Sequence, residues 1–235
     1  MPIFKIMKNW RKVNLGKIKY HYELYLEDRN CFKYPVKGLN KYSVDVFNLI
    51  KINRLFKETN KLHVGCGFTK IKGFINIDAF KTDATDFVCY IQDLPKYIRS
   101  NSVKLIYASH IIEHFSRKDS IEVLKMFYDF LTLGGELRIS VPDLLRLSEI
   151  VKYDNLEFQD MDLAQGILLG GQDTRYNYHK SIYWYSLMKK ILLSIGFKVV
   201  SEFPGFPHFL GDVQDAASMA KVNQVHISLN VKAVK

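Results

Sequence analysis

From residue 61 onward, short runs of β-branched and other apolar residues alternate with longer stretches in which apolar residues recur at helical spacing. The pattern predicts helices over residues 118–131 and 181–195, with the glycines at 134–135 and at 196 as their C-terminal stops. Strands are predicted over residues 62–65, 74–77, 86–90, 103–108, 136–141, 197–203 and 224–234. Apolar strands separated by helices indicate an α/β fold with a doubly wound, mostly parallel, seven-stranded sheet of the Rossmann-like kind. The last strand follows a long loop instead of a helix, which admits an antiparallel insertion.

Residues 1–60 follow a different pattern, with one helix-compatible stretch at 43–56. Residues 1–61 hold 14 of the 34 Lys and Arg residues but only 5 of the 24 Asp and Glu residues. We therefore expect a basic, partly helical N-terminal extension over residues 1–60, followed by a Rossmann-like domain over residues 61–235. Such an extension suits an anionic partner, which leaves nucleic acid, an inner membrane face and an anionic acceptor open. The alternative is a solvated, lysine-rich face without a partner.

The composition is that of an ordinary globular protein, with 48% hydrophobic and 25% charged residues in 235. The sequence contains no apolar stretch near 18 residues, so we expect no transmembrane helix. The N-terminus has no hydrophobic core of a signal peptide. Three cysteines without a CxxC spacing argue against a disulfide framework, so a reduced, cytoplasmic protein is the expectation.

The sequence Gly65-Cys66-Gly67 follows the first predicted strand and is the clearest chemical signal in the chain. Glycines at this place let the backbone turn tightly and approach a ligand closely. The next strand ends in Asp78, whose carboxylate can accept two hydrogen bonds from a ribose diol. This combination predicts a site for a cofactor that contains a nucleoside.

Two features argue against a dinucleotide. Lys70 stands where the third glycine of GxGxxG would be, and Asp78 comes 11 residues after Gly67 instead of about 20 after the fingerprint. Residues 68–73 are also too few for a full crossover helix, which leaves little helix dipole for a pyrophosphate.

Seven segments, in order and spacing, resemble class I S-adenosylmethionine (SAM)-dependent methyltransferases. They are LHVGCG, GFINID, DLP, ASHIIEHF, LTLGGELRISVPDL, YNYHK and IGF, and they span residues 61 to about 200. The resemblance is strongest to a short-first-helix branch of methyltransferases associated with glycan-building genes. One departure is His63, which replaces the usual acid two residues before the first glycine.

This resemblance implies SAM as the cofactor. It places the Gly65-Cys66-Gly67 turn at the methionine part and Asp78 at the ribose hydroxyls. Asp93 and Leu94 would bracket the adenine. Ser109 and His110, which follow the fourth strand, would line the methionine and sulfonium end.

Methyl transfer from a sulfonium is an in-line displacement that needs alignment, and a base if the acceptor is a hydroxyl. His110 is the first candidate for this base, because an imidazole titrates near working pH. The alternative is a histidine that only packs against or hydrogen-bonds the cofactor. His179 is the second candidate, and Asp143 is either a supporting acid or a residue of a helix's first turn.

Aromatic residues around His179 are candidates for contact with a substrate. Tyr176, Tyr178 and Tyr183 could stack on a substrate ring, and the alternative is an amphipathic helix with tyrosines at its edge. We expect residues 156–178 to cover the acceptor pocket.

The run His110-Ile-Ile-Glu113-His114 also matches HxxEH, the pattern of inverted zincins, which leaves a zinc hydrolase as a remote alternative. On a helix, His110 and His114 would share one face. The run begins where a strand ends, however, and the methyltransferase resemblance accounts for it without a metal. No metal site is therefore expected.

The acceptor is constrained mainly by what is missing. Enzymes that methylate exocyclic base amines carry an Asp/Asn-Pro-Pro-aromatic turn after strand four, where this chain has Ser109 to Ile112. A nucleic-acid methyltransferase is thus disfavoured. We expect O-methylation of a saccharide, a nucleotide sugar or a phosphorylated small molecule, of which the glycan part rests on the resemblance alone. A non-catalytic SAM-binding protein is the remaining class.

Overall fold

The computed structural model describes residues 45–152, 156–203, 215, 221–222 and 224–235. The chain divides into two compact units. Val44–Gly170 and Tyr178–Lys235 form the larger unit, which contains the sheet, and Gly171–Asn177 belongs to the other. Most of the basic extension predicted over residues 1–60 lies outside the described residues. In the part of the chain that is described, no helix has the length and apolar character needed to cross a bilayer.

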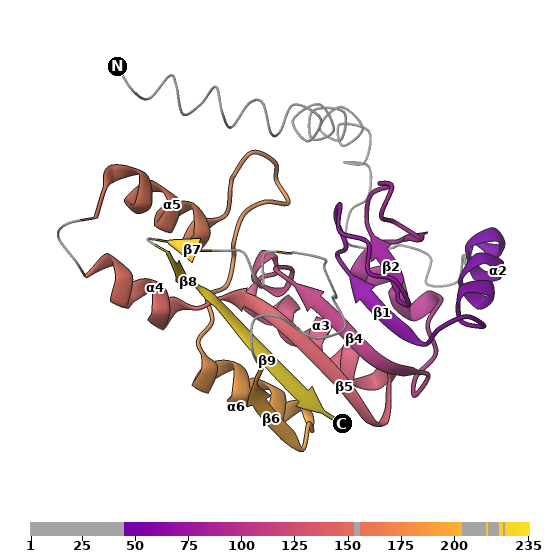
Figure 1. Ribbon diagram of the computed structural model, residues 1–235. Coiled ribbons are helices and arrows are strands. Elements are labelled where there is room, and N and C mark those ends of the chain that lie inside the picture. The colour runs from indigo at the N-terminus through magenta and orange to yellow at the C-terminus, as the bar shows by residue number, and fades with distance from the viewer. Residues whose placement is uncertain (1–44, 153–155, 204–214, 216–220, 223) are drawn as a thin grey trace. The chain divides into compact units, whose positions relative to one another are not determined.

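A seven-stranded sheet forms the centre of the larger unit (Figure 1). The strands occur in the spatial order β3-β2-β1-β4-β5-β9-β6, and β9 runs antiparallel to both of its neighbours while β1 to β5 are parallel. Their bounds are β1 Lys61–Val64, β2 Ile75–Asp78, β3 Phe87–Val88, β4 Val103–Ser109, β5 Leu131–Pro142, β6 Val199–Glu202 and β9 Ser228–Val234. The predicted α/β fold with a mostly parallel, seven-stranded sheet is confirmed, and the last strand is antiparallel, which the sequence had left open.

Five α-helices are found in the described residues: α2 Val46–Leu55, α3 Arg117–Phe130, α4 Leu144–Val151, α5 Phe158–Leu169 and α6 Tyr185–Ile195. Three begin with a side-chain cap of the expected type. Asp45 accepts from the N–H groups of Phe47 and Asn48 at α2, Ser116 accepts from the N–H of Asp119 at α3, and Asp143 caps α4. Shorter elements are the 3₁₀ helices η1 (Ile91–Lys96) and η2 (Ile112–His114) and the hairpin of β7 (Lys221–Val222) and β8 (Val225–His226).

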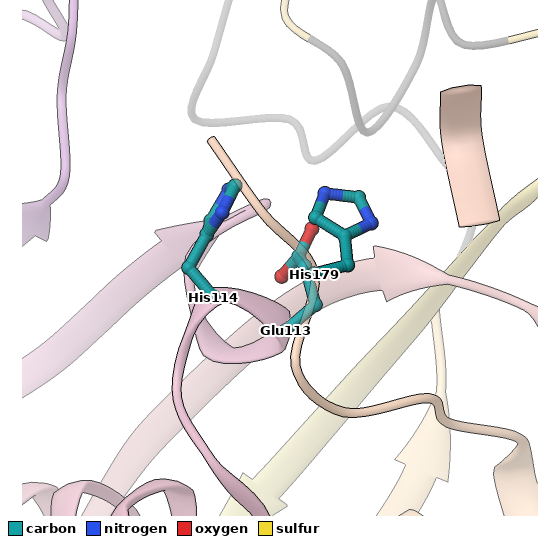
Figure 2. A group of neighbouring side chains, drawn as sticks. All are labelled: Glu113, His114 and His179. Carbon is teal, nitrogen blue, oxygen red and sulfur yellow. The ribbon is translucent and has the colours of Figure 1, made fainter. Parts of the chain in front are cut away.

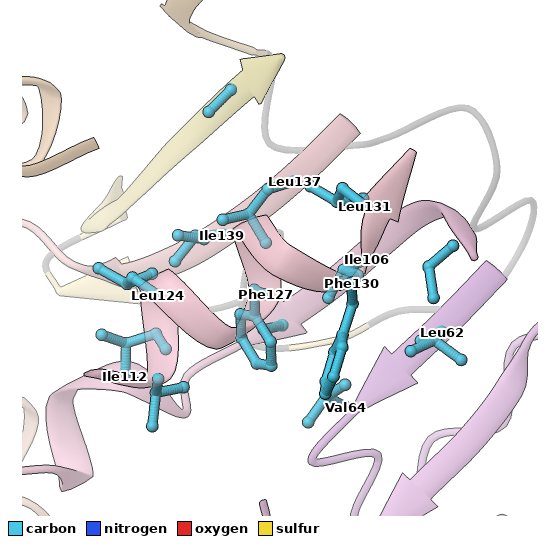
Figure 3. Close-up of a cluster of buried hydrophobic side chains, with 14 of the residues drawn as sticks. Leu62, Val64, Ile106, Ile112, Leu124, Phe127, Phe130, Leu131, Leu137 and Ile139 are labelled. Atoms are coloured by element: carbon cyan, nitrogen blue, oxygen red, sulfur yellow. The ribbon is translucent and has the colours of Figure 1, made fainter. Parts of the chain in front are cut away.

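The core lies between the sheet and helices α3 and α6. Leu124, Phe127 and Phe130 of α3 are spaced to lie on one helix face and pack in the same cluster as residues of β4 and β5 (Figure 3). Side chains alternate along β4, so that Ile106 joins this cluster while Tyr107 points to the other face and packs with Ile71 and Phe74. Ile71 and Phe74 belong to the short connection between β1 and β2 and cover the sheet where a first crossover helix would lie.

Two predicted helix ends differ from the structure. Helix α3 ends at Phe130, and the predicted glycine stop at 134–135 lies inside β5 instead. Leu131 is already extended, because its buried side chain and its pairing with Val103 belong to the sheet. Gly134 takes a φ of +75° and donates its N–H to the carbonyl of Lys235 at the end of the chain.

Helix α6 begins at Tyr185, four residues later than predicted, because tertiary hydrogen bonds hold the preceding segment extended. The N–H of Ser181 donates to the carbonyl of Glu113, and Tyr183 forms an isolated bridge with Asp143. The predicted stop of α6 at Gly196 is confirmed, since its N–H donates to the carbonyls of Leu192 and Leu193 at a φ of +123°.

Truncation of Phe127 tests this account of the core. Phe127 has no exposed surface, so Phe127→Ala should lower the free energy of unfolding by about 3–5 kcal/mol in urea denaturation. The control is Leu133→Ala, because Leu133 is 80% exposed and its truncation should leave the unfolding midpoint nearly unchanged. Equal midpoints for the two variants would contradict the packing described here.

Candidate functional site

The turn after β1 is held by two backbone hydrogen bonds to β2. The N–H groups of Gly65 and Cys66 donate to the carbonyl of Ile77 at 2.8 and 3.0 Å. Gly65 has a φ of +70° and Gly67 a φ of +51°, in the left-handed region that favours glycine. A Cβ on Gly65 would lie 1.9 Å from Cδ1 of Ile111, whereas a Cβ on Gly67 would meet nothing within 4 Å. Gly65 is thus required by packing against the segment after β4, and Gly67 borders open space.

Asp78 ends β2 beside this turn, as the sequence predicts. Its Oδ2 accepts from the N–H of Gly67 at 2.8 Å, and its Oδ1 accepts from the N–H of Phe80 at 3.0 Å. Burial raises the pKa of Asp78 above its ordinary value, although these backbone hydrogen bonds oppose the rise. The carboxylate is therefore oriented by the glycine turn at the carboxyl edge of the sheet.

The buried side chain of Asn76 holds the connection between β1 and β2 together. Its Oδ1 accepts from the N–H of Ile71 at 2.9 Å and lies 3.0 Å from Nδ1 of His63. Its Nδ2 donates to the carbonyls of Ile71 and Phe74 and to Oδ2 of Asp86. Burial lowers the pKa of His63, so the residue that replaces the usual acid is a neutral structural histidine.

The other residues that the resemblance assigns to the cofactor lie at the same edge but differ in exposure. Asp93 and Leu94 lie in η1, where Asp93 pairs with Lys96 at 2.7 Å and the side chain of Leu94 is fully buried in the core. Leu94 therefore has no exposed surface that a ligand could contact in this structure. Ser109 ends β4 and pairs with Ser140 of β5.

The backbone of His110 has a φ of +53°, which is uncommon for a residue other than glycine. Its Nε2 lies 3.0 Å from Oγ of Ser228, and its Nδ1 lies 3.1 Å from Oε1 of Glu113. The backbone N–H of His110 donates to the carbonyl of Ser140 at 2.8 Å. The ring of His110 is thus held between the start of β9 and η2. Strained backbone conformations such as that of His110 occur preferentially at functional sites.

Glu113 lies at the centre of a histidine cluster (Figure 2). It is 1% exposed, and one ligand atom each from Glu113, His114 and His179 all lie within 4.8 Å of one another. The rings of His114 and His179 are edge to face, with centroids 4.8 Å apart. The carbonyl of Glu113 accepts from the N–H groups of Lys180 and Ser181, which fixes His179 beside η2.

The charges in this cluster shift two pKa values. Burial opposes ionisation of Glu113, but His110, His114 and His179 together outweigh it and lower the pKa of Glu113. Burial also lowers the pKa of His179, more than the nearby Glu113 charge raises it. The surroundings thus favour the charged form of Glu113 and the neutral form of His179.

His110 and His114 do not share a helix face, as the zincin alternative would require. His110 precedes η2 in a left-handed conformation, and η2 spans only Ile112–His114. The ring of His110 therefore lies between Glu113 and Ser228, and His179 is the histidine that lies beside His114. The zincin arrangement, with two ligands one helical turn apart, is not formed.

The remaining candidate residues are dispersed. Tyr183 is 2% exposed, and its OH donates to Oγ of Ser181, so its ring packs in the core. Tyr178 is exposed next to His179, and Tyr176 stacks with Arg175 inside the separate Gly171–Asn177 unit. Asp143 caps α4 through the N–H of Leu145 and lies 3.2 Å from Nε of Arg146, which agrees with the helix-start alternative.

Sequence reasoning missed three residues that organise the site: Asn76, Ser228 and Glu113 as the centre of the cluster. Asn76 sits inside a predicted strand where an apolar residue is typical, and this is a readable signal of a buried polar role. Ser228 carries no such signal, because its position opposite His110 depends on the pairing of β9 with β5.

No protein-family model matches the chain, and no curated protein does. Among solved structures, the chain is similar to a SAM-dependent methyltransferase from Archaeoglobus fulgidus, with 14% identity, a TM-score of 0.46, and coverage of 81% of this chain and 94% of that one. A SAM-dependent methyltransferase from Thermotoga maritima gives 13% identity, a TM-score of 0.45, and coverage of 92% and 99%. For a SAM-dependent methyltransferase from Listeria monocytogenes the identity is 17% and the TM-score 0.42, with coverage of 81% of this chain and 99% of that one. A shared sheet at such identities is compatible with many activities, so function has to be argued from the site.

Alanine at the two turn glycines should separate packing from ligand access. Gly65→Ala should lower the free energy of unfolding by at least about 2 kcal/mol, since it adds a clash with Ile111 to the positive φ. Gly67→Ala should lower the free energy of unfolding by only about 1 kcal/mol, because the positive φ is its only source of strain. Urea denaturation measures both, and a larger loss for Gly67→Ala would contradict this assignment.

The two described cysteines should be unreactive in the folded protein. Burial raises the pKa of the Cys66 thiol to about 12, with the Asp78 charge adding to it, and burial likewise raises the pKa of Cys89 to about 12. Iodoacetamide at pH 8 should therefore leave both thiols unmodified until urea unfolds the chain, as read by peptide mass mapping. Rapid labelling of Cys66 in the native protein would show that the turn opens in solution.

Proposed function

We propose that the chain is a SAM-dependent methyltransferase that binds its cofactor at the turn between β1 and β2. The observation that carries the proposal is the pairing of Asp78 with Gly67: a carboxylate oriented by the turn stands beside a glycine that borders open space. This pairing lies at the carboxyl edge of a parallel sheet, where ligands bind in open α/β folds.

The residues fit an adenosyl group in two respects. A carboxylate offers about four lone-pair sites. Two backbone N–H groups bond to Asp78, one at each oxygen, which leaves acceptor capacity for the two hydroxyls of a ribose. The missing Cβ of Gly67 leaves room for a ligand to approach the backbone. When bound, SAM supplies a methyl group that is already activated as a sulfonium.

For transfer to a hydroxyl, we take His110 as the general base. A proton on Nδ1 facing Glu113 leaves the lone pair on Nε2, where Ser228 now lies 3.0 Å away. The partly exposed ring can accept a proton from an acceptor that reaches Nε2. His179 is the weaker candidate for a base, because its ring packs against His114 and Glu113.

The acceptor in this proposal is a saccharide, a nucleotide sugar or a phosphorylated small molecule, methylated on oxygen. The exposed ring of Tyr178 beside His179 supports a role in stacking on such an acceptor. The excess of Lys and Arg in residues 1–61 supports attraction of an anionic acceptor, or contact of a cytoplasmic enzyme with the inner membrane face.

Removal of the Asp78 charge tests the cofactor site directly. Asp78→Asn should weaken the binding of S-adenosylhomocysteine by at least about tenfold in calorimetric titration, since hydrogen bonds to charged groups contribute about 1.5–3 kcal/mol. The matched control is Asp83→Asn, an exposed carboxylate in the loop that follows β2, which should bind as tightly as the wild type. Equal affinity of the Asp78 variant and the wild type, or no binding by the wild type, would overturn the proposal.

The pH dependence of the same titration gives an independent readout. Protonation removes the acceptor that holds the ribose, and burial raises the pKa of Asp78. The affinity for S-adenosylhomocysteine should therefore fall on acidification from a pH higher than an exposed aspartate would require. In the Asp78→Asn variant this dependence should disappear.

A further inference from the structure

The cluster of Glu113, His114 and His179 is not used by the cofactor site, and its chemistry points to a different ligand. Two imidazole nitrogens and one carboxylate oxygen make up the set, each supplied by a different side chain. Figure 2 shows that Glu113 and His114 come from η2 while His179 comes from a neighbouring extended segment. The same combination of two histidines and one glutamate holds zinc in several hydrolytic enzymes and leaves one position open.

The buried carboxylate gives an independent reason to expect a cation. Glu113 is 1% exposed, and within the described residues neither of its oxygens has a partner in hydrogen-bond geometry. His110 Nδ1 lies 3.1 Å from Oε1, at ion-pair distance only. Nδ1 of His114 is also buried without a hydrogen-bond partner in the described chain. Buried charged and polar groups without partners destabilise a fold by about 1–3 kcal/mol or more each, so such a group calls for a ligand.

The surroundings of the cluster resemble the support that metal ligands receive. The backbone N–H of His179 donates to the carbonyl of Leu169 at 2.9 Å, which fixes the part of the chain that carries this ring. His110 faces Oε1 of Glu113 and so can orient the carboxylate. His114 and His179 are partly exposed, which provides a path of entry for an ion.

The three ligand atoms would have to move closer together to bind a zinc ion. The three ligand atoms lie within 4.8 Å of one another, whereas ligand atoms around tetrahedral zinc lie about 3.4 Å apart at bonds of about 2.1 Å. Rotation of the two partly exposed imidazoles can supply this contraction, because neither lies in a regular α-helix or strand.

We propose that Glu113, His114 and His179 bind one zinc ion, or a neighbouring divalent first-row metal ion, with an open coordination position. The ion neutralises the buried carboxylate and occupies both imidazole lone pairs. Ile111, which packs against Gly65, is part of the same segment, so the ion would lie near the cofactor turn. The open coordination position would take an oxygen ligand.

The experiment uses the full chain, purified without a polyhistidine tag and treated with a chelator. Titration with zinc, followed by equilibrium dialysis and elemental analysis, should give one ion per chain. Cobalt in place of zinc should give visible d–d absorption bands that zinc removes. Zinc should also raise the melting temperature, since a ligand that binds only the native state stabilises it.

His179→Ala and Glu113→Gln should each weaken zinc binding by at least tenfold and abolish the cobalt bands. The matched control is His226→Ala, which removes an exposed imidazole in β8 and should leave stoichiometry and affinity unchanged. Because Glu113 is buried, its variant is accepted only if its circular dichroism is native. His179→Ala changes a partly exposed residue and keeps the test decisive if Glu113→Gln does not fold.

No zinc uptake by the wild type, or unchanged uptake by His179→Ala, would overturn the metal site. Titration with S-adenosylhomocysteine separates this outcome from failure of the proposed function. Cofactor binding without zinc binding would refute the metal site alone. Zinc binding without cofactor binding would refute the methyltransferase and leave the metal site intact.

Discussion

The hydrogen bonds of the Asn76 side chain are the interaction on which the glycine turn after β1 and the start of β2 depend. Few residues separate the Gly67 turn from β2, so no crossover helix can form, and the backbone groups of the connection have no helical partners. The carboxamide of Asn76 replaces those partners by bonding to both backbone groups of Ile71 and to the carbonyl of Phe74. Ile71 and Phe74 are thereby held against Tyr107, so the face of the sheet opposite to α3 and α6 is covered here without a helix.

Asp78 and Gly67 depend on the same arrangement. Asp86 bonds to both the backbone and the side chain of Asn76, and Lys70 pairs with Asp86 at 2.6 Å. These contacts fix the ends of the connection, so that the N–H of Gly67 reaches the carboxylate of Asp78. A site that lacks the usual helix dipole therefore orients its carboxylate through side-chain hydrogen bonds.

Glu113 plays a corresponding part on the other side of the Gly65 turn. Its carbonyl holds the chain at Lys180 and Ser181, and its carboxylate faces His110. Segments that follow β4 and precede α6 are joined there at the carboxyl edge of the sheet. One buried residue thus brings together His110, which we assign to the base, and the two histidines of the proposed metal site.

The sequence by itself determined the sheet and the cofactor turn, because both are local. Alternating apolar runs marked the strands, and Gly65, Gly67 and Asp78 lie near one another along the chain, where one turn brings them together. Tertiary structure decided the C-terminal end of α3 and the start of α6, since the buried Leu131 and the hydrogen bonds of Ser181 override local helix propensity. It also decided which side chains the two histidines of HxxEH contact. The spacing of His110 and His114 is compatible with one helix face, but in the fold strand pairing places Ser228 beside His110. The carbonyl of Glu113 accepts from the N–H groups of Lys180 and Ser181, which holds His179 beside His114. Contacts between residues far apart in the chain leave no periodic pattern, and only the folded sheet brings such residues together.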